Sequence, residues 1–295
     1  MVKNQNLKNL LTEYLTLTTK EIRKIAEKEG GREILGEVIN RPEDINIGID
    51  RVGEEILEKL LKKYNVKATV FSEPENGDIV FGDCLYGSID PFDGSVLYLR
   101  GFQQDWYTAL SFFDKKRKPI CCGISDILNE KFYISDEKEN YLIDLKDKKK
   151  NKISPSRKKT LTEPIVLASY IMSSQYSRKF FNIFGELISN LHPKALFYPN
   201  GGSYIYAFLA SGLIDAYVMF DEPRSEIDPG YIIAKRTGCS IVSVNSDGSS
   251  QDYEFSPGCQ HDKVGLLIAA CTPQLRDELI KYYVKRYKEK YFFKS

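Results

Sequence analysis

Apolar residues recur at helical spacing near the start of the chain. Over residues 4–29 they follow the i, i+3, i+4 pattern of an amphipathic helix, which Gly30 and Gly31 would end. A second apolar stripe predicts a helix over 51–64. Residues 32–47 between them have weak periodicity, and we expect them to form a partly mobile connection.

From residue 68 the pattern changes to short apolar or alternating runs separated by turn residues, which predicts a sheet with hairpins. The predicted strands cover 68–72, 79–82, 86–90, 106–113, 119–127, 131–135 and 141–145. Beyond residue 160 strands and helices alternate, which is typical of layered α/β packing. Strands are predicted at 164–169, 195–198, 215–220, 240–245 and 265–270, and helices at 175–190, 202–211, 228–237 and 273–290.

This pattern predicts an α/β (layered α+β) protein with two domains. The N-terminal α+β domain would span 1–160 and the C-terminal α/β domain 161–295. A length of 295 residues agrees with two domains of about 150 residues each. Hydrophobic residues make up 42% of the chain, which is enough for a packed core.

The charge balance excludes some partners. Lys and Arg number 42 and Asp and Glu 41, so bulk charge does not favour nucleic acid or an anionic membrane. A basic run over 146–159 is better explained as a solvated inter-domain loop, because no aromatic residue is interleaved for base stacking. No run approaches the ~20 apolar residues of a membrane span, and the N-terminus lacks a signal-peptide pattern. We expect a cytoplasmic protein.

The cysteine and histidine content argues against zinc or a disulfide framework. The six cysteines form no C-x-x-C pair, and the chain has two histidines. Metal chemistry, if present, would therefore use oxygen ligands, which favour Mg²⁺, Mn²⁺ or Ca²⁺.

The segment D-P-F-D-G-S at residues 90–95 is the strongest candidate for chemistry. Pro91 forces a bend after an apolar strand, and Gly94 allows backbone angles closed to other residues. Asp90 and Asp93 can then converge on one cation, with nearby peptide N–H groups directed at an anion. An ordinary surface turn is the alternative, and a calcium loop is disfavoured because acids at alternate positions and a final Glu are missing.

A second acidic segment lies at residues 226–238. Asp228 has the position of a helix N-cap, Pro229 that of a first helical residue, and Gly238 that of a C-terminal stop. Capping alone would explain Asp228. A carboxylate here that also faces a metal would place the helix dipole beside a phosphate.

Together these segments resemble the inositol monophosphatase and fructose-1,6-bisphosphatase superfamily of Mg²⁺-dependent, lithium-sensitive phosphatases. The signature D-P-[ILF]-D-G-[ST] is matched at 90–95, an earlier acidic motif at Glu73, and an earlier Asp before a helix at Asp50. A late W-D motif is matched in part at Asp228. The glycine–serine helix start and the A-x-G-x-x-D-A motif are matched by the segments 201–203 and 210–216. The order and spacing agree over residues 45–270.

The resemblance implies an alternating α-β-α-β-α sandwich of the sugar phosphatase type, with the active site between the two domains. It implies a phosphomonoesterase, commonly a homodimer, that uses two or three Mg²⁺ ions, with Mn²⁺ as an alternative. Glu73 and Asp90, with the backbone carbonyl of Phe92, would hold the first ion. Asp90, Asp93 and Asp228 would hold the second.

The resemblance also implies roles around the attacking water and the phosphate. Asp50 would lie near a third, weaker metal site and near the water, which Ser95 and Glu73 would orient. The peptide groups of Gly94, Ser95 and Val96 would bind the phosphate. The catalytic residues implied are thus Glu73, Ser95 and Asp50.

The substrate side departs from the family pattern. Met219 stands where many members carry an acid that binds sugar or inositol hydroxyls, and Asp221 or Glu222 could substitute for it. Arg224 could meet a second phosphate. The substrate-binding residues implied are Gly202, Ser203, Asp221 and Arg224.

The sequence therefore predicts a Mg²⁺-dependent phosphomonoesterase acting on a sugar or inositol phosphate, without nucleic-acid or membrane partners. Fructose 1,6-bisphosphate and inositol 1-phosphate are the candidate substrates, and archaeal-type members with both activities are similar in length. A related branch that acts on 3′-phosphorylated adenosine nucleotides is an alternative. Changed residues beside Glu73 and Asp228 leave a second alternative, a catalytically silent binding protein on this fold.

Overall fold

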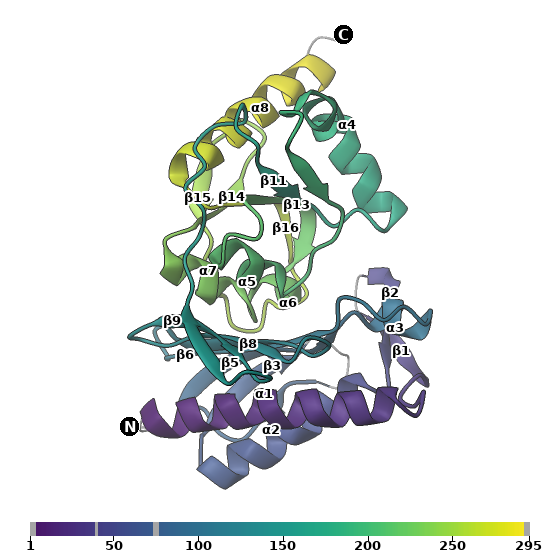
Figure 1. The fold of residues 1–295 in the computed structure, drawn as a ribbon, viewed down its shortest axis with the longest axis vertical. Coiled ribbons are helices and arrows are strands. Elements are labelled where there is room, and N and C mark those ends of the chain that lie inside the picture. The colour runs from purple at the N-terminus through teal and green to yellow at the C-terminus, as the bar shows by residue number, and fades with distance from the viewer. Residues whose placement is uncertain (1–3, 39–40, 73–76, 292–295) are drawn as a thin grey trace.

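Five layers of helix and sheet alternate along the long axis of the molecule (Figure 1). The computed structural model describes residues 4–38, 41–72 and 77–291. Helices α1 (Asn4–Ala26) and α2 (Asp50–Tyr64) form the first layer and pack under an eight-stranded sheet. Helices α5 to α7 lie between this sheet and a six-stranded sheet, whose other face α4 and α8 cover. This is the predicted α-β-α-β-α sandwich, so the predicted fold class is confirmed.

The eight-stranded sheet is built mainly from consecutive hairpins. In sheet order its strands are β10 (Lys149–Lys152), β9 (Asn140–Asp144), β8 (Lys131–Ser135), β7 (Pro119–Asp126), β6 (Tyr107–Phe113), β5 (Leu85–Asp93), β3 (Ala68–Ser72) and β4 (Ile79–Val80). Only the β3–β5 pair is parallel among these strands as described. The parallel pair places the ends of β3 and β5 on the same edge, where the D-P-F-D-G-S segment begins.

The six-stranded sheet is mixed. In order its strands are β12 (Leu196–Tyr198), β11 (Val166–Ala168), β13 (Ala216–Pro223), β16 (Lys263–Ala270), β14 (Ser240–Val244) and β15 (Ser250–Asp252). The helices are α3 (Ser95–Leu99), α4 (Ser174–Asn190), α5 (Ile205–Ala210), α6 (Arg224–Ile227), α7 (Tyr231–Thr237) and α8 (Pro273–Tyr291). None of the described helices is both long and apolar enough to cross a membrane.

Helix α1 lies close to the sheet because the sequence supplies leucines on one face and a glycine opposite. Leu11 and Leu15 are buried, and a Cβ at Gly123 of β7 would come within 2.8–3.0 Å of their side chains. Burying each leucine stabilises the fold by about 1.5–3 kcal/mol. On the other face of this sheet, a large core cluster joins Phe71 and Phe113 to residues of the six-stranded sheet. The domain boundary at residue 160 stays a prediction; it falls in the segment that connects the two sheets.

The main helices agree with the prediction, and Thr272 caps α8 as expected, because its Oγ1 accepts a hydrogen bond from the Leu275 N–H at 3.2 Å. Residues 32–47, predicted only as a connection, contain the antiparallel hairpin of β1 (Ile34–Val38) and β2 (Arg41–Ile47). Part of the basic run 146–159 forms strand β10 at the edge of the larger sheet.

Candidate active site

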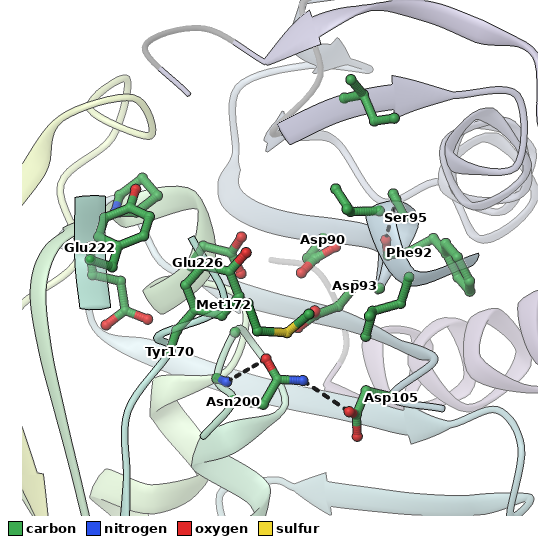
Figure 2. A pocket seen from close by; sticks show the side chains of 18 of the residues that line it. Asp90, Phe92, Asp93, Ser95, Asp105, Tyr170, Met172, Asn200, Glu222 and Glu226 are labelled. Carbon is green, nitrogen blue, oxygen red and sulfur yellow. Dashed lines mark hydrogen bonds between the residues drawn. The ribbon is translucent and has the colours of Figure 1, made fainter. Parts of the chain in front are cut away.

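A cleft is lined by residues from both halves of the chain (Figure 2). One wall is the end of β5 with the start of α3, and the other comes from β13, α6 and the segments before α4 and α5. The cleft encloses about 830 Å³ of empty space, open solvent at its mouth included.

The turn after β5 sets the position of the first two acids. Its ladder with β6 is irregular between Asp90 and Asp93, where Pro91 and Phe92 interrupt the regular pairing. Gly94 has φ +116°, and a Cβ there would lie 2.3 Å from the carbonyl oxygen of Asp105. Only glycine fits this turn without strain. The structure thus brings Asp90 and Asp93 together on one side of the cleft.

Glu226 completes a three-acid cluster with these two. One carboxylate oxygen from each of Asp90, Asp93 and Glu226 lies within 4.8 Å of the others. Asp90 is 1% exposed, and burial together with the charges of Asp93 and Glu226 raises the pKa of its carboxyl well above the usual range. Its Oδ1 is buried without a hydrogen-bond partner among the described residues. Three oxygen ligands, mutual repulsion and an unsatisfied buried oxygen fit a divalent cation such as Mg²⁺.

Asp93 is held by the segment before α5. Ser203 Oγ donates a hydrogen bond to Asp93 Oδ2 at 3.1 Å. Gly202 has φ +131°, and a Cβ there would lie 2.3 Å from the same carboxylate oxygen. Gly202 and Ser203, predicted as substrate-binding residues, thus pack against a member of the acidic cluster, and Gly202 also lines the cleft.

Asp228, predicted as a metal ligand, does not join the cluster. Its Oδ1 accepts a hydrogen bond from the Tyr253 hydroxyl at 2.7 Å, and its carbonyl accepts one from Ser111 Oγ at 2.9 Å. Asp228 ends α6 with helical backbone angles and is not the N-cap of α7, which is Gly230. Two residues along a helix are about 200° apart around its axis, so Glu226 and Asp228 cannot face the same side. The structure thus places Glu226, and not the expected Asp228, in the acidic cluster with Asp90 and Asp93.

Burial acts on Asp228 as well. It raises the pKa of the Asp228 carboxyl to about 7, and the hydrogen bond from Tyr253 and the charge of Arg224 oppose this shift. Asp228 therefore lies in a buried polar site that does not line the cleft, with partners of its own.

Asp50 and Ser95 form a second polar pair on the cleft wall. Ser95 Oγ lies 2.8 Å from Asp50 Oδ1 and 2.9 Å from the Phe92 carbonyl oxygen, so its one proton is shared between two acceptors. The other Asp50 oxygen accepts the Ile47 N–H at 2.7 Å, which fixes the carboxylate at the start of α2. Gly94, Ser95 and Val96, the predicted phosphate-binding residues, also line the cleft.

The remaining predicted residues lie elsewhere. Asp221 forms an ion pair with Lys179, and Arg224 donates hydrogen bonds to the Tyr253 hydroxyl at 3.2 Å and the Glu254 carbonyl at 2.9 Å. Neither Asp221 nor Arg224 is among the residues that line the cleft, because local partners hold both side chains. Glu73, predicted as a catalytic and metal-binding residue, lies outside the described residues.

Sequence analysis missed Asp105 and Asn200, which join the two walls. Asp105 Oδ2 accepts a hydrogen bond from Asn200 Nδ2 at 2.9 Å (Figure 2), and its Oδ1 accepts one from the Tyr198 hydroxyl at 3.0 Å. Both residues line the cleft. The P-N-G-G sequence was a visible turn signal for Asn200, whereas Asp105 had no distinguishing pattern.

Comparison with known proteins identifies the fold. No protein-family model matches the chain, and no curated protein matches it in sequence. Solved structures, several of them of inositol monophosphatases, do match over nearly the whole chain, so the chain has the inositol monophosphatase fold. The resemblance expected from the sequence is therefore confirmed at the level of the fold.

Three of these structures illustrate the likeness. Extragenic suppressor protein suhB from Bartonella henselae has 12% identity and a TM-score of 0.72, covering 95% of this chain and 98% of that one. An inositol monophosphatase–fructose 1,6-bisphosphatase has 21% identity and a TM-score of 0.67, covering 97% of this chain and 100% of that one. An inositol monophosphatase from Thermotoga maritima has 17% identity and a TM-score of 0.70, covering 95% and 98%.

Proposed function

We propose that this chain is a Mg²⁺-dependent phosphomonoesterase that hydrolyses a phosphate ester of a sugar-like or inositol-like alcohol. The observation that carries the proposal is the cluster of Asp90, Asp93 and Glu226 beside the Gly94 turn. Three carboxylates in a buried cleft repel an anionic substrate unless a cation is present. The fold shared with inositol monophosphatases supports the same function.

Asp90, Asp93 and Glu226 would hold Mg²⁺, with Glu73 as a further predicted ligand. When bound, Mg²⁺ supplies positive charge to the phosphoryl oxygens and makes water more acidic. Phosphoryl transfer needs mainly positioning and charge neutralisation, and no serine or cysteine nucleophile is required.

The chain's own groups would position the reactants. Asp50 holds the Ser95 hydroxyl at the cleft wall, where that hydroxyl can orient a water for in-line attack. The peptide N–H groups at Gly94 and Val96 lie on the same wall and would bind phosphate oxygens. Ser203 and Gly202 keep Asp93 fixed, so the acidic cluster needs little rearrangement. From the resemblance we also propose a cytoplasmic homodimer.

The experiment that tests this proposal measures phosphate release with Mg²⁺ and then with excess chelator. The substrates are fructose 1,6-bisphosphate, inositol 1-phosphate, adenosine 3′,5′-bisphosphate and an aryl phosphate. We expect chelator-sensitive turnover of at least one of them, abolished in the Asp90→Asn variant. A folded protein that binds Mg²⁺ in calorimetry but releases no phosphate would contradict the proposal and favour a silent binding protein. Preference for adenosine 3′,5′-bisphosphate would favour the nucleotide branch.

A further inference from the structure

The wall of the cleft opposite Ser95 and Phe92 is largely apolar. Tyr170, Met172, Tyr176 and Met219 line it together with the buried Glu222, and Figure 2 shows Tyr170, Met172 and Glu222 on this side. The rings of Tyr170 and Tyr176 meet edge to face at 5.6 Å. Met172 is 48% exposed, so a bound molecule can cover its side chain.

The carboxylate on this wall, Glu222, is buried and holds a hydrogen bond within the protein. The Tyr217 hydroxyl donates a hydrogen bond to Glu222 Oε1 at 2.8 Å, and Glu222 is 2% exposed. Thioether and aromatic surface offers little hydrogen bonding to hydroxyl groups. A polyol pressed against this wall would leave hydroxyls unpaired, which disfavours its binding.

The charges of the cleft are of one sign. Six acidic residues line it, and no Lys, Arg or His is found among its described lining residues. The acids are Asp50, Asp90, Asp93, Asp105, Glu222 and Glu226. Two cations carried by α4 and α6 have partners of their own, Lys179 in Asp221 and Arg224 in the Glu254 carbonyl. A cation at the acidic cluster would serve the reacting phosphate, so a second anionic group would remain without a partner.

We propose that the substrate is a monophosphate whose alcohol part presents an apolar or aromatic face to the wall of Tyr170, Met172 and Met219. This alcohol carries no second phosphate or carboxylate. The inference rests on the proposed phosphatase function and narrows its substrate class: among ring alcohols of sugar or inositol size, bisphosphates and fully hydroxylated rings are poorer substrates than monophosphates with an apolar face.

Two matched substrate pairs test this specificity with the full-length protein and Mg²⁺. Cyclohexyl phosphate and inositol 1-phosphate differ only in ring hydroxyls, and fructose 1-phosphate and fructose 1,6-bisphosphate differ only in a second phosphate. We expect kcat/KM for cyclohexyl phosphate to exceed that for inositol 1-phosphate by about tenfold. We expect a preference of similar size for fructose 1-phosphate over the bisphosphate at low salt, weakening as salt screens the charges.

Variants at Met172 test whether this wall causes the expected substrate preference. Met172→Ala removes apolar surface, so we expect KM for cyclohexyl phosphate to rise by about three- to tenfold while kcat stays unchanged. Met172→Lys supplies the missing cation, and we expect it to reduce the discrimination against fructose 1,6-bisphosphate. Leu213 is 54% exposed and does not line the cleft, so Leu213→Ala and Leu213→Lys are matched controls. They should change neither KM for cyclohexyl phosphate nor the discrimination against fructose 1,6-bisphosphate.

The outcomes separate the two proposals. Inositol 1-phosphate or the bisphosphate hydrolysed as efficiently as its partner would overturn the specificity while the phosphatase function stands. The same holds if the Met172 and Leu213 variants behave alike. Absence of chelator-sensitive turnover with all four substrates and with the aryl phosphate would overturn the phosphatase function, and the specificity with it.

Discussion

The acidic cluster around Asp90 and the buried site around Asp228 lie on either side of the short helix α6. Their carboxyl groups nevertheless have different partners. Asp228 has a tyrosine hydroxyl at 2.7 Å within the fold, whereas Asp90 has two other carboxylates as neighbours and a buried oxygen without a donor among the described residues. A buried acid with its own partner is a structural element. A buried acid surrounded by other acids is a site for a cation.

Removal of a cluster charge gives the largest expected effect. Asp90→Asn should lower kcat at least about 10³-fold, because the Mg²⁺ that offsets substrate charge loses a central ligand. The metal-free variant should be no less stable than the parent, because a buried repulsive carboxyl has been replaced by a neutral group of the same shape. Phosphate release and denaturant unfolding in chelator measure both. A variant that keeps activity, or that unfolds more easily, would show that Asp90 supports the fold and does not hold a cation.

The variants Glu226→Gln and Asp228→Asn compare an acid of the cluster with the acid of the separate buried site, two positions apart in the chain. Glu226→Gln should lower kcat/KM about 10²-fold and weaken Mg²⁺ binding in calorimetry, because the cluster loses a charged ligand. Asp228→Asn keeps an oxygen that accepts the Tyr253 hydroxyl, so activity should stay within about threefold of the parent. The reverse result would return Asp228 to the metal site.

A smaller effect is expected from the ionisation of Asp228, which makes the free energy of unfolding depend on pH. Its pKa is about 7 in the folded protein against a usual value of 3.8, so the native state holds this proton more tightly than the unfolded state. The contribution of Asp228 to stability is therefore fully present below about pH 4 and is lost as pH rises to about 7, by up to ~1.4 kcal/mol per unit. We expect the difference in unfolding free energy between the metal-free parent and Asp228→Asn to fall over this window. A difference that is flat or rises with pH would show that Asp228 is already ionised.

The smallest effect concerns the support of Asp93. Ser203→Ala removes one hydrogen bond at 3.1 Å, so kcat/KM should fall by about three- to tenfold with a stability loss of about 1 kcal/mol. Ser211→Ala is a matched control, because among the described residues Ser211 Oγ donates only to carbonyls of α5; this variant should leave kcat/KM unchanged. Equal kinetic losses in both variants would mean that the Ser203 effect is general destabilisation.

The sequence pattern predicted the features that depend on neighbouring residues, namely the helices and the turn after β5. Helix and strand periodicity located α1, α2, α4 and α8, and the Pro91–Gly94 turn indicated that Asp90 and Asp93 meet. The pattern could not show whether Glu226 or Asp228 joins Asp90 and Asp93, because both precede the same proline and glycine. The answer depends on which side of α6 faces the cleft. Asp105 escaped notice because its partners, Tyr198 and Asn200, lie more than ninety positions away.

The hydrogen bond from Ser203 to Asp93 joins residues 110 positions apart, and the acidic cluster unites acids of β5 and α6 that lie even further apart along the chain. Contacts of such separation form late, because a long loop must close before they are made. Half of the chain therefore cannot assemble the cation site, and neither can a collapsed state whose two sheets have not yet met. In the proposed function, Mg²⁺ would bind tightly only after the six-stranded sheet has joined the first, and cation binding would then report that folding of the whole chain is complete.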